Sequence, residues 1–118
     1  MKITPFNLSG KTFINTQNTE NGEVDTQTIF YYSQQGDVIE ADYRGGVVLT
    51  GHLMGRMTAP DRFHMVYHHL NLNGELRVGQ CESTICIAPD GKLILQESWQ
   101  WLNGDLSTGH SQLVEING

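Results

Sequence analysis

The sequence predicts an all-β protein, a single closed antiparallel up-and-down β-barrel of about eight strands. Short turn signals recur along the 118 residues, and apolar and polar side chains alternate between them. No stretch carries a sustained apolar repeat of helical period. The length suffices for one domain, which we take as residues 1–118.

Turn signals divide the chain into extended segments. Four are Asn-Gly or Asp-Gly dipeptides, which suit the positive φ angles of two-residue hairpin turns; they begin at Asn21, Asn73, Asp90 and Asn103. The others are Gln35-Gly36, Arg44-Gly45-Gly46 and Thr58-Ala59-Pro60-Asp61. The predicted strands are residues 11–20, 23–34, 37–43, 47–57, 62–72, 75–88, 92–102 and 105–116. Residues 1–10 fit a short helix, an arm or a strand.

The same turns predict which side chains share a face, because directly opposed residues of paired strands lie on one side of a sheet. With two-residue turns in the second half of the chain, Glu82 lies opposite Met65 and Trp99. His110 then lies opposite Glu97. One continuous surface across the last four strands therefore faces the barrel interior.

In the first half of the chain, a three-residue loop at 44–46 turns Val47 and Leu49 inward and Val48 outward. Sequential pairing of the strands without covering helices would leave two exposed edges, and closure into a barrel removes them. A barrel of eight strands has room for packed side chains or for one small ligand.

The predicted interior is apolar in its first strands and partly polar in its last four. Buried polar groups cost free energy unless they are paired, so their presence indicates a pocket for a polar small molecule. The candidate ligand-binding residues are Tyr67, His69, Glu82, Glu97, Trp99, Trp101 and His110. The tryptophans would supply contact area and the glutamates would accept hydrogen bonds, which favours an amine-bearing or hydroxyl-rich ligand.

Two other interpretations of these residues stay open. Glu97 and His110 form a buried hydrogen-bonded pair with water satisfying the remaining groups, or His110 acts as a general base oriented by Glu97. No nucleophile or oxyanion hole is recognisable, so the catalytic residues are unknown. His52 and His68 face each other on the outside as only two ligands, and no metal site or cofactor is predicted.

A predicted apolar patch lies on the outer face, where side chains of neighbouring strands break the polar pattern. Its members are Ile85, Ile87, Ile94 and Leu113. A contiguous apolar patch favours self-association, so a homo-oligomer, a homodimer in the simplest case, is a possible partner arrangement. The same patch supports a third function class, a structural or interaction module.

Charge and composition restrict the partners. Thirteen acidic and seven basic residues leave a net charge of −6, which argues against nucleic acid and against an anionic membrane surface. No apolar run approaches the ~20 residues that a membrane-spanning helix needs. Cys81 and Cys86 are spaced unfavourably for a disulfide, and free thiols together with the absence of a recognisable secretory signal favour a cytoplasmic location.

Several motifs resemble a family of small bacterial proteins. They are the runs Tyr67–Gly79 (YHHLNLNGELRVG) and Leu95–Gly104 (LQESWQWLNG), with the shorter segments Thr19–Val24 (TENGEV) and Tyr43–Gly46 (YRGG). Members are often labelled N-acetylglutamate synthase, so the resemblance implies an N-acetyltransferase as an alternative function. It implies no particular catalytic residues. In architecture the chain is also similar to avidin-like and lipocalin-like barrels.

Overall fold

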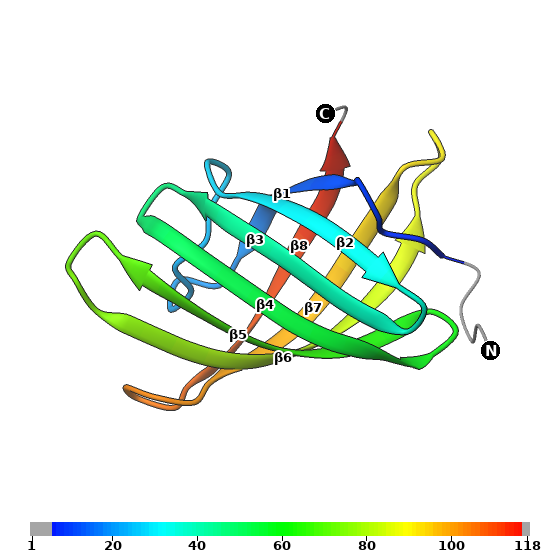
Figure 1. The fold of residues 1–118 in the computed structure, drawn as a ribbon. Coiled ribbons are helices and arrows are strands. Elements are labelled where there is room, and N and C mark those ends of the chain that lie inside the picture. The colour runs from blue at the N-terminus through cyan, green and yellow to red at the C-terminus, as the bar shows by residue number, and fades with distance from the viewer. Residues whose placement is uncertain (1–5, 117–118) are drawn as a thin grey trace.

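A computed structural model of the protein describes residues 6–116, and this part of the chain contains eight β-strands and no helix. The strands are β1 (Thr12–Asn18), β2 (Ile29–Gln35), β3 (Val38–Gly45), β4 (Val48–Ala59), β5 (Arg62–Asn71), β6 (Leu76–Ile87), β7 (Leu93–Trp101) and β8 (Thr108–Ile116). Each strand pairs antiparallel with the next, and β8 pairs with β1 (Figure 1). The predicted closed up-and-down barrel is confirmed.

The strand boundaries follow the turn signals closely, with one exception. Residues 23–28 were expected to begin the second strand, but β2 starts only at Ile29. The chain between β1 and β2 is instead a segment of turns and irregular backbone, residues 19–28. Of the first ten residues, 1–5 lie outside the described part, and 6–10 form an irregular arm that buries Leu8 completely.

The core fills the barrel with inward side chains from every strand. Phe13, Phe63 and Leu95 are fully buried, and each contributes about 1.5–3 kcal/mol through removal of its side chain from water.

In the described residues no helix is long and apolar enough to cross a membrane.

The hairpin loops of the second half are longer than the two residues predicted. At the β5–β6 turn the Asn71 amide donates to the Glu75 carbonyl at 3.0 Å, so the loop comprises three residues and ends at Gly74 with φ of 79°. The β6–β7 loop is built in the same way around Gly91, whose φ is 88°. A type I turn followed by a left-handed glycine gives this loop length.

One extra loop residue moves every side chain of the following strand to the other face, because side chains alternate with period two. β6 therefore turns Glu82 outward, contrary to the prediction, and buries Cys81, Ser83 and Ile85. The second long loop restores the predicted facing of β7. The β7–β8 loop spans residues 102–106 and reverses the facing again, so that β8 buries Gly109, Ser111 and Leu113 and exposes His110.

Two further predictions of facing are wrong. β-Bulges at the β3–β4 and β4–β5 pairings bury Val48 and expose Val47 and Leu49. The outer apolar patch does not form, because Ile85 and Leu113 are buried inside the barrel. Self-association consequently stays a prediction without the surface on which it rested.

Glycines on neighbouring strands allow large aromatic rings to lie flat against the barrel wall. A Cβ atom at Gly79 would collide with the Tyr67 ring, and one at Gly109 would collide with the Trp99 ring. These glycines are the direct cross-strand partners of the two aromatic residues. The ring positions therefore depend on the absence of a side chain opposite them.

Substitution of Gly109 by alanine is expected to lower the free energy of unfolding by about 1–3 kcal/mol, because the Trp99 ring and the Thr19 hydroxyl must both move to admit a methyl group. Thr108→Ala on the same strand, at an exposed position, is the control and should change stability by about 0.5 kcal/mol or less. Urea denaturation of both variants measures the difference. Equal stability of the two variants would contradict this packing.

Candidate functional site

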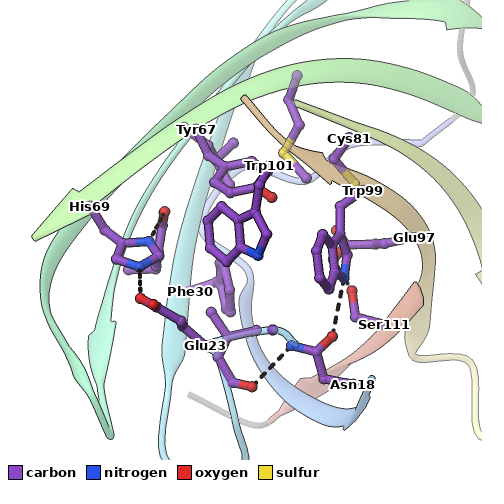
Figure 2. A pocket seen from close by; sticks show the side chains of 15 residues that line it. Asn18, Glu23, Phe30, Tyr67, His69, Cys81, Glu97, Trp99, Trp101 and Ser111 are labelled. Atoms are coloured by element: carbon purple, nitrogen blue, oxygen red, sulfur yellow. Dashed lines mark hydrogen bonds and ion pairs between the residues drawn. The ribbon is translucent and has the colours of Figure 1, made fainter. Parts of the chain in front are cut away.

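The segment 19–28 lies over one end of the barrel interior and is held there by side chains of β1 and its own loop. Asn18 Nδ2 donates to the Val24 carbonyl at 3.1 Å. Asn21 Nδ2 donates to the Thr108 carbonyl at 2.9 Å, at the start of β8. Gly22, Glu23 and Val24 of this segment line a buried cavity together with residues of the barrel wall (Figure 2).

Aromatic rings form much of the cavity wall. The centroids of Trp99 and Trp101 are 5.5 Å apart, and Tyr67 packs edge-on to Trp101 at 5.9 Å. The two indole N–H groups are already used: Trp99 Nε1 donates to Asn18 Oδ1 at 3.1 Å, and Trp101 Nε1 donates to the Asn21 carbonyl at 2.9 Å. The rings therefore offer faces and edges to the cavity rather than free polar groups.

The Glu97 carboxyl group projects from β7 into the cavity (Figure 2). Only 8% of the residue is exposed. Its Oε1 accepts a hydrogen bond from Ser111 Oγ at 2.9 Å, whereas its buried Oε2 has no partner. Burial raises the pKa of Glu97 to about 7, against the opposing effect of the Ser111 hydrogen bond.

Further unpartnered polar atoms lie in the interior near Glu97. Ser83, its cross-strand partner on β6, has a fully buried hydroxyl without a hydrogen bond. The buried Tyr32 hydroxyl also lacks one, and burial, followed by the Glu97 charge, raises the pKa of Tyr32 well above its usual value. Unpaired buried groups of this kind are uncommon in folded proteins, and several together indicate a place for water or for a ligand.

A second carboxylate, that of Glu23, approaches the cavity from the covering segment. Its Oε1 lies 2.8 Å from His69 Nε2 and its Oε2 lies 2.7 Å from Arg77 Nη1. Asn71 Nδ2 adds a longer contact of 3.3 Å. Burial works to raise the pKa of Glu23, but the His69 and Asn71 hydrogen bonds and the Arg77 charge outweigh it and hold the pKa below its usual value.

His69 is the centre of a short buried chain of hydrogen bonds. Its Nδ1 lies 2.9 Å from the Tyr43 hydroxyl, on the side opposite Glu23. Burial lowers the pKa of His69, which favours the neutral ring despite its contact with Glu23. The neutral ring accepts from Tyr43 at Nδ1 and donates to Glu23 at Nε2, so both nitrogens are satisfied.

The cavity is small, and the covering segment forms part of its wall. Its volume is about 40 Å³, more than the ~10–15 Å³ that one water requires but far less than the ~300 Å³ of a small ligand pocket. A larger depression of about 390 Å³ lies on the outer side of the same segment, and Gly22, Glu23 and Val24 line both spaces. These three residues are thus the partition between the cavity and the outside.

Comparison with known proteins assigns the chain to a family. Residues 6–116 match the family model described as avidin-like protein. The chain belongs to the avidin-like family. No curated protein and no solved structure matches it. The predicted resemblance to avidin-like barrels is therefore confirmed, whereas the synthase label, the bacterial origin and the likeness to lipocalins stay predictions.

This avidin-like barrel brings together five of the seven candidate ligand-binding residues. Lining the cavity are Tyr67, His69, Glu97, Trp99 and Trp101. The other two, Glu82 and His110, lie on the outer face along a shallow groove of β5–β8. Their displacement follows from the longer hairpin loops, which reverse the facing of β6 and β8.

The predicted pair of Glu97 and His110 consequently does not form. The His110 ring contacts Ser98 on the outside, with 3.2 Å between its Nδ1 and the Ser98 hydroxyl. The interpretation that His110 is a general base oriented by Glu97 is therefore wrong.

His52 and His68 do face each other on the outer surface, with ring centroids 6.3 Å apart. Among residues 6–116, no group of three or more His, Cys, Asp or Glu side chains is arranged to hold a metal ion.

Sequence reasoning missed several residues of the site. Asn18 and Glu23 come from a stretch that was divided between two strands and a turn. The predicted two-residue turn at Asn73-Gly74 turns Arg77 outward, yet Arg77 contacts Glu23, and Ser111 was not among the candidate residues. An available signal was the glycine pattern of the hairpins, since a left-handed glycine also closes three-residue loops, which would have placed Arg77 on the inner face.

Proposed function

We propose that this avidin-like barrel binds a small molecule in the cavity beneath the 19–28 segment, with a hydrogen-bond donor of the ligand directed at Glu97. The observation that carries the proposal is the unpartnered Oε2 of Glu97, a buried carboxyl oxygen on a residue that lines the cavity. A small-molecule ligand is also compatible with the avidin-like family, which includes binders of compact ligands.

The chemistry of the cavity supports a ligand that combines N–H or O–H donors with a flat or apolar part. A carboxyl group with a pKa of about 7 is partly ionised at neutral pH, and a donor or cationic group beside it would favour the ionised form. The faces of Trp99 and Trp101 suit planar or cationic groups.

Titration followed by tryptophan emission tests this proposal, because Trp99 and Trp101 are the only tryptophans of the chain and both line the cavity. Small amines, amidines, ureas and sugars are the probes. A saturable change is expected for at least one class. The absence of any change across all classes, with ordered water filling the cavity in a crystal structure, would contradict the proposal.

Glu97→Gln is expected to weaken binding of a responding probe by about 10–100-fold, since a hydrogen bond to a charged group contributes about 1.5–3 kcal/mol. Glu82→Gln makes the same chemical change on the outer face and is the matched control, with wild-type affinity expected. Calorimetric titration measures both. Equal losses in the two variants, or none in either, would contradict a contact between the ligand and Glu97.

Other functions lack comparable support. A catalytic role depended on Glu97 with His110, which face opposite sides of the barrel wall. The interaction module depended on a patch that is partly buried. The N-acetyltransferase, the homo-oligomer and the cytoplasmic location stay predictions.

A further inference from the structure

The carboxylate of Glu23 occupies a set of donors that belongs to the barrel wall. His69 lies on β5, Asn71 at its end and Arg77 on β6, and all three contact this one carboxylate (Figure 2 shows the His69 contact). We infer that these three side chains form a carboxylate-binding site, and that Glu23 is its resident occupant, which a carboxylate group of the ligand displaces on entering the cavity. This inference rests on the proposed function and specifies the ligand class.

The donors keep their orientation through contacts that do not involve Glu23. The Tyr43 hydroxyl fixes His69 so that its Nε2–H points at the carboxylate. The Asn71 amide is fixed by its Oδ1, which accepts from the backbone amides of Asn73 and Glu75 at 3.0 Å each. A site whose donors are oriented by the fold itself remains competent when its occupant leaves.

The guanidinium group of Arg77 is fixed in the same manner. Its Cζ atom lies 3.9 Å from the centroid of the Trp101 ring, a cation–π contact from a buried indole. Arginine also presents paired donors that suit a carboxylate better than a single ammonium would. A ligand carboxylate would therefore meet a positive charge already held in position.

Glu23, in contrast, is carried by backbone outside the barrel ladder. Residues 19–28 belong to no strand. Side chains of Asn18, Asn21 and Trp101 hold the segment, but its backbone has few hydrogen bonds, for example Gly22 N to the Thr19 carbonyl at 3.0 Å. Segments with few backbone bonds to the sheet open at lower free energy than strands do. The occupant is thus more easily displaced than the donors.

Displacement of Glu23 would also open the route to Glu97. Gly22, Glu23 and Val24 line both the cavity and the depression outside it, so movement of these residues would widen the connection between the two spaces. The carboxylate site then lies at the mouth and Glu97 lies farther in. The inference therefore concerns only the carboxylate group of the ligand, which the donors on β5 and β6 would hold.

A tethered occupant competes with an external carboxylate at an effective concentration on the order of millimolar or higher. Glu23→Ala removes the competitor and leaves all three donors in place. Acetate is the probe, because it carries only the carboxylate. We expect acetate to bind Glu23→Ala at least about tenfold more tightly than wild type, with a change in tryptophan emission because Arg77 lies on Trp101.

Glu75→Ala is the matched control. The Glu75 carboxylate accepts from the same Asn71 amide at 2.9 Å but contacts neither His69 nor Arg77. Its removal is expected to leave acetate affinity at the wild-type value. Chloride at equal ionic strength should not reproduce the acetate response, since a monatomic ion lacks the two oxygens that the paired donors of arginine match.

Should Glu23→Ala fail to fold, Glu23→Gln retains an oxygen acceptor for His69 while removing the charge, and acetate affinity above that of wild type is expected for it as well. Circular dichroism verifies folding of each variant. No acetate binding by a folded Glu23 variant would overturn the inference. That result leaves the proposed function standing if neutral donor ligands still bind through Glu97, so the two failures are distinguishable.

Discussion

Replacement of Trp101 by alanine is expected to lower the free energy of unfolding by about 3–5 kcal/mol. The ring is 3% exposed and packs against Tyr67, His69 and Trp99. Its N–H also holds the covering segment through the Asn21 carbonyl. Truncation therefore leaves a cavity and releases the covering segment as well.

Two variants separate these contributions. Trp101→Phe keeps an aromatic ring but not the N–H, and a loss of about 1 kcal/mol from the hydrogen bond is expected in addition to the smaller packing area. Leu102→Ala truncates the exposed neighbour in the sequence and should have little effect. Guanidinium denaturation measures all three. A loss below 1 kcal/mol for Trp101→Ala would be inconsistent with a packed ring at this position.

The second large effect is a pH-dependent loss of stability caused by Glu97. Burial raises the pKa of this carboxyl from an ordinary value of 4.5 to about 7 in the folded protein. Between these values the folded state retains a proton that the unfolded state has lost, so the free energy of unfolding falls as the pH rises. The total loss is about 3 kcal/mol, reached above pH 7, and no loss is expected below pH 4.5, where both states are protonated.

Glu97→Gln is expected to remove this dependence, because an amide does not ionise, and the variant should be more stable than wild type above pH 7. Denaturant unfolding at pH 4, 5, 6, 7 and 8 gives the two curves, with Glu82→Gln as the exposed control. Only the difference between wild type and variant is assigned to Glu97, since other groups titrate in the same interval. Parallel curves for all three proteins would contradict an elevated pKa.

Sequence reasoning was accurate for strand number and topology because these depend on where turns occur. Glycine positions mark the hairpins directly, and alternation between them identifies strands. The cavity residues of β5 and β7 were also correctly placed, His69 and Glu97 among them. For β7 this success came from two successive loop-length errors that cancel in facing.

The same errors explain the residues that were misplaced. An Asn-Gly or Asp-Gly pair fits a two-residue turn, yet it also fits the end of a three-residue loop, and the dipeptide alone does not distinguish them. Glu82 was assigned to the interior for this reason, and His110 because the five-residue loop 102–106 was predicted as a two-residue turn. Burial preferences argue for the observed register, since it exposes two charged or polar side chains and buries Ile85 and Leu113.

Glu23 could not be located by periodicity at all. It belongs to an irregular segment, whose path depends on individual contacts such as the Asn18 and Asn21 side-chain hydrogen bonds. Such contacts join residues far apart in the sequence, as between Glu23 and Arg77, and no local pattern specifies them. The site was therefore predictable in its wall and not in its cover.

The short pairing between β1 and β2 has a consequence for local opening of the barrel. β1 pairs with β2 only through Thr12, Phe13 and Ile14, whereas it is joined to β8 along most of its length. Amide protons beside this short junction should exchange with deuterated solvent sooner than those of the central strands. Because the stretch bearing Glu23 directly connects these two strands, a transient parting of them would also loosen the segment that covers the cavity.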